Sequence, residues 1–149
     1  MNRLDTSEIV DGAAPTKRLF TAAEATRALV LVRRILRDVV TGYSRLLDLH
    51  ERVEAADDGD AHDCSPDKAE MVRLVEQLQE CMEEFDQIGV ELKEWTTGIV
   101  DFPSVVDGRE VCLCWQMGER TVRHWHESDA SCACREPLRT LTALKKIAV

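Results

Sequence analysis

The side chains best suited to chemistry are concentrated in one short part of this sequence. Residues 98–138 of the 149-residue chain contain four of the six Cys, two of the four His and two of the three Trp. Thiolates, imidazoles and carboxylates bind transition metals and act in acid–base and nucleophilic catalysis. We therefore expect this stretch to carry the function and the rest of the chain to position it.

Histidines and cysteines of this stretch could bind a metal ion such as zinc. His124 and His126 are two residues apart, so on a strand both imidazoles point to the same face. Two Cys-x-Cys pairs supply the thiols of Cys112, Cys114, Cys132 and Cys134. Zinc favours thiolate and neutral imidazole in a tetrahedral array, although its cysteines usually come from Cys-x2–4-Cys knuckles. The alternative is a set of partly buried thiols and exposed histidines.

Carboxylates beside His126 offer a second kind of site. The candidates are Asp101, Glu119, Glu127 and Asp129. With the imidazole they could bind a hard divalent metal or form an acid–base pair. The spacing does not choose between these roles, and the alternative is a solvated hairpin end with salt bridges to Arg123 and Arg135.

Cys114 would be a nucleophile only if a base lay within hydrogen-bond reach of its thiol. A simple two-residue turn at Gly118-Glu119 places Arg123, and not a histidine, opposite Cys114. We therefore do not expect a Cys–His dyad. An adjacent arginine would favour the thiolate.

Turn signals divide residues 90–127 into an antiparallel meander. Strands are expected near 90–95, 98–106, 109–116 and 120–127. Asp107-Gly108 is a two-residue hairpin signal, which places Val106 opposite Arg109 and Asp101 opposite Cys114.

Alternation along these strands predicts two different sheet faces. The apolar face, expected to pack on helices, contains Val100, Phe102, Val111, Leu113 and Trp115. The other face is expected to form a polar, thiol-bearing surface of Asp101, Pro103, Glu110, Cys112 and Cys114.

Two long apolar stripes predict a helical hairpin over residues 21–89. Thr21 and Glu24 form a capping-box pattern, after which apolar residues step by three and four as far as position 53. Ser65 and Pro66 begin a second such helix, and Gly89 is placed to end it. The acidic link 56–64 is expected to be a solvated loop, since its spacing does not match the EF-hand calcium pattern.

The expected fold is α+β, a long antiparallel helical hairpin packed on a small antiparallel β-meander. Residues 1–18 are expected to be a flexible tail, 19–138 a single domain with its meander at 90–127, and 139–149 a tail or short helix.

Composition excludes several classes of function. Nineteen basic and 28 acidic residues give a net charge of -9, which disfavours nucleic acid as a partner. The apolar runs are too short to cross a membrane, and the amino terminus lacks a secretory signal. We expect a cytoplasmic protein with reduced cysteines.

The blocks Val100-Asp-Phe-Pro103, Leu113-Cys-Trp115 and Trp125-His-Glu127 together resemble the bacterial DUF2203 family over about residues 20–138. The family is uncharacterised, so the resemblance implies no reaction. It does favour the residues on the family's blocks, which are Asp101, Cys114, Trp115, Glu119, His126, Glu127, Asp129 and Arg135. The positions that look particular to this chain are Cys112, His124, Cys132 and Cys134. A metal site of His126 with Asp101, Glu119 or Glu127 is thereby preferred over the thiol-rich one.

Two functions follow as hypotheses. The first is a binding or interaction module that uses the polar end of its sheet, with an unknown protein partner or a second copy packed on the helix seams. The alternative is a small metal-dependent, hydrolase-like enzyme with a His/carboxylate site. Three or more ligand atoms converging in a pocket would favour the enzyme, and side chains scattered over a convex face would favour the module.

Overall fold

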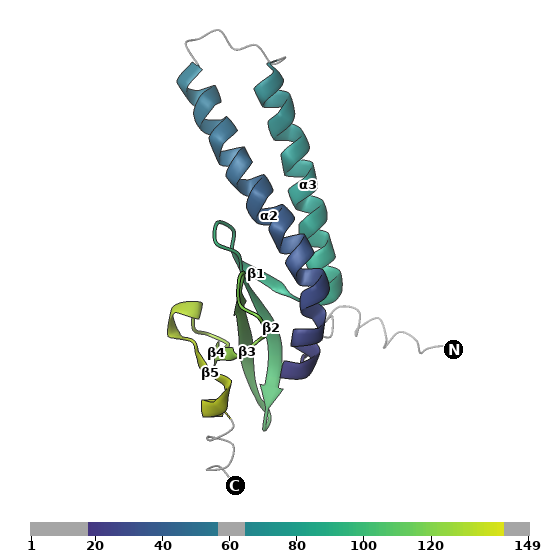
Figure 1. Cartoon of the computed structure of the whole chain (residues 1–149), viewed down its shortest axis with the longest axis vertical. Helices are drawn as coiled ribbons and strands as arrows, with labels where there is room; N and C mark the ends of the chain where they lie inside the picture. The colour runs from purple at the N-terminus through teal and green to yellow at the C-terminus, as the bar shows by residue number, and fades with distance from the viewer. Residues whose placement is uncertain (1–17, 57–64, 142–149) are drawn as a thin grey trace, which may run out of the picture.

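The computed structural model describes residues 18–56 and 65–141. Helices α2 (Ala22–Ala56) and α3 (Pro66–Ile88) form an antiparallel hairpin, whose lower part packs on an antiparallel sheet with strand order β1-β2-β3-β4-β5 (Figure 1). The strands are β1 (Glu91–Glu94), β2 (Ile99–Val106), β3 (Arg109–Gln116), β4 (His124–Glu127) and β5 (Glu136–Pro137). A 3-10 turn, η1 (Cys132–Cys134), lies between β4 and β5. The predicted α+β fold is confirmed.

Three expected segments lie wholly or largely outside the described residues. They are the amino-terminal tail up to residue 17, the acidic link at 57–64 and the carboxyl-terminal segment from residue 142. Among the described residues, no helix combines the length and the apolar character needed to cross a bilayer.

The helix ends form as their sequence signals predict. Thr21 N donates to Glu24 Oε1 at 2.9 Å and Glu24 N donates to Thr21 Oγ1 at 3.1 Å, which completes the capping box. Lys68 N donates to Ser65 Oγ at 3.1 Å, with proline at the first position of α3. Gly89 ends α3 in the left-handed region at φ 94°, which favours glycine.

The apolar seams of the two helices are buried mainly where the sheet supports them. The seam of α2 contributes Leu29, Val32, Leu36 and Val39 to the core, and that of α3 contributes Leu78, Cys81 and Phe85. Farther along α2, Leu49 is buried, whereas the neighbouring His50 is exposed and lies 3.8 Å from Glu54. Pairing of these helices with a second copy stays a prediction.

The β2–β3 hairpin has the predicted register. Val106 pairs with Arg109 and Asp101 pairs with Cys114. The predicted apolar face is confirmed, because its residues are buried in one core with the helices: Val100, Phe102, Val111, Leu113 and Trp115.

The end of the sheet differs from the prediction. The strand expected at 120–127 begins only at His124, because residues 117–123 form a longer connection than a two-residue turn. The chain then returns through η1 and adds β5 next to β4, a strand that the sequence did not predict. This return covers the sheet face that was expected to be a surface.

Glu94 closes the β1–β2 turn and provides a test of pH dependence. Its carboxylate accepts hydrogen bonds from the backbone and hydroxyl groups of Thr97 and Thr96, which lower the pKa of Glu94 to about 2. A folded-state pKa below the unfolded value means that this stabilisation is present above the unfolded pKa and is lost as the pH falls toward 2. In urea titrations between pH 6 and 2.5, Glu94→Gln should therefore flatten the acid decline of the unfolding free energy. Parallel pH profiles of the two proteins would contradict this.

Candidate functional site

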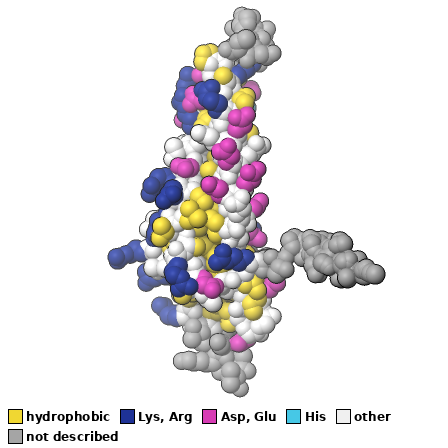
Figure 2. All heavy atoms as spheres, turned by 90° about the vertical axis from the view of Figure 1, so that its right-hand side faces the viewer, with side chains coloured by type: hydrophobic (Ala, Val, Ile, Leu, Met, Phe, Trp, Pro, Cys, Tyr) yellow, Lys and Arg dark blue, Asp and Glu magenta, His cyan; other side chains and the backbone are white. Residues whose placement is uncertain are grey.

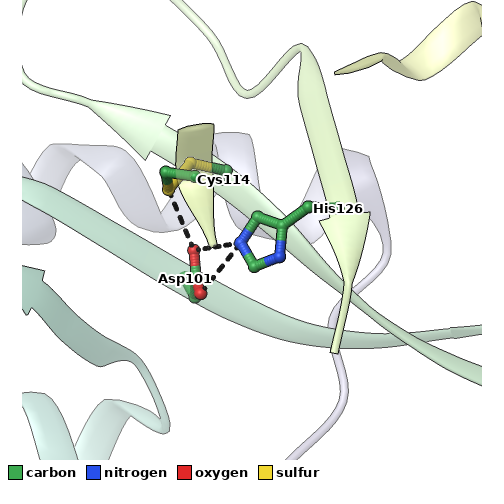
Figure 3. Close-up of side chains that lie close together, drawn as sticks. Asp101, Cys114 and His126 are labelled. Atoms are coloured by element: carbon green, nitrogen blue, oxygen red, sulfur yellow. Dashed lines mark hydrogen bonds and ion pairs between the residues drawn. A yellow bond between two sulfur atoms is a disulfide. The ribbon is translucent and has the colours of Figure 1, made fainter. Parts of the chain in front are cut away.

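Four potential metal ligands converge on the sheet face that points away from the helices. Asp101 on β2, Cys114 on β3 and His126 on β4 lie close together, and η1 adds Cys132. One ligand atom of each residue lies within 4.8 Å of every other. Figure 3 shows the carboxylate of Asp101 next to both the imidazole of His126 and the disulfide that includes Cys114. We call these four residues the ligand cluster.

The ligand cluster is buried, which corrects the prediction of a polar surface. Asp101 is 1% exposed, Cys114 0% and His126 3%. Alternation along the strands correctly indicated that these residues face away from the helical core. It could not show that the chain after β4 folds back and forms a second cover over them.

The hydrogen-bond partners of His126 show which nitrogen of its ring carries a hydrogen. Its Nδ1 lies 2.7 Å from the carbonyl oxygen of Glu127, which can only accept, so Nδ1 carries a hydrogen and donates it. Its Nε2 lies 3.1 and 3.0 Å from the two carboxylate oxygens of Asp101. Burial raises the pKa of Asp101, and the hydrogen bond to His126 opposes that rise. With the hydrogen on Nδ1, Nε2 and the ionised carboxylate would both be acceptors. A proton or a metal cation is therefore needed between them.

Cys114 and Cys132 form a disulfide in this structure, so the expectation of reduced cysteines does not hold for this pair. The two residues are 18 positions apart, with Cα atoms separated by 6.6 Å. The Sγ of Cys132 also lies 3.7 Å from Asp101 Oδ1. Reduction of the disulfide would leave two thiols directly beside the carboxylate and the imidazole.

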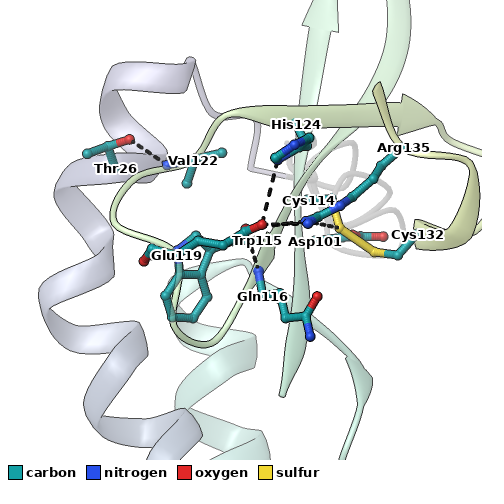
Figure 4. Close-up of polar contacts among 10 residues, drawn as sticks. All are labelled: Thr26, Asp101, Cys114, Trp115, Gln116, Glu119, Val122, His124, Cys132 and Arg135. Carbon is teal, nitrogen blue, oxygen red and sulfur yellow. Dashed lines mark hydrogen bonds and ion pairs between the residues drawn. A yellow bond between two sulfur atoms is a disulfide. The ribbon is translucent and has the colours of Figure 1, made fainter. Parts of the chain in front are cut away.

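An ion pair lies beside the sulfur of Cys114. Arg135 Nη1 lies 3.9 Å from that sulfur and 3.3 Å from Glu119 Oε1 (Figure 4). Glu119 Oε1 also accepts from Gln116 N at 2.9 Å. Burial acts to raise the pKa of Glu119, but the hydrogen bonds from Arg135 and Gln116 hold it below its usual value. A carboxylate–guanidinium pair therefore lies against the ligand cluster.

The longer β3–β4 connection also corrects the residue opposite Cys114. The structure pairs His124 with Cys114, where a two-residue turn predicted Arg123. His124 Nδ1 lies 3.7 Å from Glu119 Oε2, too far for a hydrogen bond. The guanidinium beside the sulfur belongs to Arg135, which comes from the returning chain.

The remaining candidates are spread over the molecule. Trp115 is a core residue whose Nε1 donates to the carbonyl of Glu119 at 3.0 Å. Glu127 forms an ion pair with Arg109 away from the ligand cluster. Asp129 and Cys134 are exposed, and Cys112 is buried. The structure therefore brings together one carboxylate, one imidazole and two sulfurs, in place of the preferred set of one imidazole with several carboxylates.

The sequence model of one protein family, described as "Uncharacterized conserved protein (DUF2203)", matches residues 18–138. Neither a curated protein nor a solved structure matches the chain. The matched residues include the whole hairpin, the sheet and the ligand cluster.

Proposed function

Because the chain belongs to the DUF2203 family, whose description names no reaction, we propose its function from the site alone: it is an interaction module stabilised by a zinc ion. The proposed ligands are Asp101, Cys114, His126 and Cys132. The observation that carries this proposal is the convergence of four ligand atoms within 4.8 Å.

The donor set suits zinc. Imidazole nitrogen, thiolate sulfur and carboxylate oxygen are the three donor types that zinc accepts, with four ligands in structural sites. A ligating histidine commonly donates its second ring N–H to a carbonyl or carboxylate, and His126 does so to the carbonyl of Glu127. This leaves Nε2 as the ligand atom, on the side of the ring that faces the other three ligand residues.

Zinc binding requires reduction of the disulfide first. A phosphine reductant and one water molecule convert the disulfide into two thiols. The phosphine gives two electrons and takes the oxygen of the water to become the phosphine oxide, and the two protons of the water go to the sulfurs. Each thiol then releases its proton when it ligates the metal. The guanidinium of Arg135, 3.9 Å from Cys114 Sγ, offsets part of the negative charge that the two thiolates and the carboxylate add.

Convergence of three or more ligand atoms was expected to favour the enzyme if those atoms lined a pocket, but here the ligand residues are mostly buried. A closed, buried ligand set favours an interaction module over a hydrolase. Catalytic zinc keeps one position open for water or substrate, whereas structural zinc has four protein ligands. Here Cys132 supplies the fourth ligand, and three of the four residues are buried. The ion would hold η1 and the following β5 against the sheet, which fixes the outer surface available to a partner.

The test is metal content with a matched pair of cysteine variants. The chain is reduced with a phosphine, incubated with zinc, desalted and analysed for bound metal. We expect about one zinc per chain in the wild type and in Cys134→Ser, because Cys134 is an exposed free thiol outside the cluster. Cys132→Ser changes a residue only two positions before Cys134. Its zinc content should fall to a small fraction of the wild-type value, because the change removes one of the four ligands.

Equal zinc content in both cysteine variants would contradict the proposed ligand set. Absence of zinc from the reduced wild type would contradict the proposal as a whole. Hydrolytic activity that requires the bound metal would favour the enzyme instead.

A further inference from the structure

A second candidate site lies in an open cleft beside the ligand cluster. The cleft has a volume of about 570 Å3 and lies between the β3–β4 connection and the residues that follow β5. Three arginines line it, Arg120, Arg123 and Arg139. Their charges point to a ligand that is distinct from a metal ion.

The charge of this cleft is opposite to that of the whole protein. The chain carries a net charge of -9, yet Glu119 is the single acidic residue among the described ones that line the cleft. The carboxylate of Glu119 is already paired with Arg135. Across residues 18–56 and 65–141, the side chains of the three lining arginines have no hydrogen bond or ion pair. Several cationic side chains lining one cleft favour an anionic ligand there.

The backbone that carries these arginines is held in place from several sides. Arg33 on α2 donates to the carbonyl of Arg120 at 2.6 Å, and Thr26 Oγ1 accepts from Val122 N at 3.2 Å. Leu138 N donates to the carbonyl of Arg123 at 2.8 Å, which joins the two walls of the cleft. Figure 4 shows the connection from β3 to β4 lying against α2, with Thr26 bonded to Val122. A fixed backbone reduces the part of the ordering cost of binding that would come from the main chain.

Basic side chains are unevenly distributed on another face of the molecule as well. In the face drawn in Figure 2, most basic side chains lie along one edge and most acidic ones along the other. A separation of this kind lets a local positive region attract an anion despite the negative total charge, because charges more than about 10 Å apart are largely screened at physiological salt.

We propose that this cleft binds a small, multiply charged oxyanion, a phosphoryl compound or a polycarboxylate. Arginine presents a planar fork of N–H donors that matches both of these groups. A volume of about 570 Å3 lies within the range of small-molecule sites. A nucleic acid does not fit as well, because its long backbone would also meet the acidic remainder of the protein.

The proposal is tested by titration calorimetry on the full chain. The probes are inorganic pyrophosphate and citrate, each compared with sodium chloride at the same ionic strength. We expect one of the two probes to bind at one site per chain, and its identity distinguishes a phosphoryl ligand from a carboxylate ligand. Arg123→Glu and, separately, Arg120→Glu should each weaken that binding at least tenfold. The matched control is Arg73→Glu, which makes the same charge change at an exposed position of α3 and should leave binding unchanged.

Three results would overturn the inference. The first is no heat of binding beyond that of sodium chloride for either probe. The second is an equal loss of affinity in the control and in both cleft variants, which would indicate a general charge effect. The third is tighter binding of a DNA oligonucleotide than of either probe. The titration is run on the zinc-free protein, because pyrophosphate and citrate both chelate zinc, so that its outcome is independent of the proposed metal site.

Discussion

His126→Ala is expected to lower the unfolding free energy of the metal-free protein by about 3–5 kcal/mol, the range for removing one partner of a buried ion pair. His126 and Asp101 are 3% and 1% exposed, and Nε2 is the hydrogen-bond partner of both carboxylate oxygens. Without the imidazole, a buried carboxylate stays without its partner or takes up a proton. Urea denaturation in the presence of a chelator measures the effect.

Two further variants test this explanation. His50→Ala removes an exposed histidine whose contact with Glu54 is long, so it should change the unfolding free energy by less than about 0.5 kcal/mol. The double variant Asp101→Ala/His126→Ala should be less destabilised than the sum of the two single variants, because the carboxylate that needs a partner is also gone. Additive effects would show that the loss comes from packing rather than from the pair.

Trp115→Ala should destabilise the protein by about 3–5 kcal/mol, the usual cost of removing a large buried side chain. The side chain is 0% exposed in the core between sheet and helices, and Arg33 lies over its ring at 5.6 Å. Its Nε1 also donates a hydrogen bond to the carbonyl oxygen of Glu119. Trp115 is therefore expected to act in packing rather than in chemistry, and thermal and urea unfolding measure its contribution.

Trp95→Ala is the matched control for this change. Trp95 is only half-buried and packs against Tyr43, with ring centroids 5.3 Å apart, so the loss should be clearly smaller. Trp115→Phe should retain most of the packing and lose mainly the hydrogen bond. Comparable losses in Trp95→Ala and Trp115→Ala would contradict the distinction between core and edge.

Features that depend on neighbouring residues could be predicted from the sequence. The capping box at Thr21 and Glu24 forms because both hydrogen bonds lie within one helical turn. The register of β2 and β3 follows from Asp107-Gly108, since a two-residue hairpin leaves one arrangement of the flanking strands. Local chemistry was sufficient in both cases.

Features that depend on the returning chain could not be predicted in this way. Cys132 reaches Cys114 only because the chain after β4 folds back over the sheet, and no periodic pattern marks the residues of that return. The same return brings Arg135 to Glu119 and builds one wall of the cationic cleft. The net charge of the chain also gave no sign of the positive cleft at Arg120 and Arg123, because a sum over all residues contains no information about where the charges lie.

The hairpin extends well beyond the sheet that supports its base (Figure 1). Along α2, a helix of about 52 Å at 1.5 Å per residue, Leu49 is the single buried residue after Gly42, and α3 has none before Leu78. The tips are joined by the exposed pairs Arg45–Glu70 and Arg52–Asp67, which salt screens. Amide hydrogens in this distal half should therefore exchange through local opening, at a much lower free energy than those of the base. We therefore expect added salt to speed amide exchange in the distal half of the hairpin more than in its base.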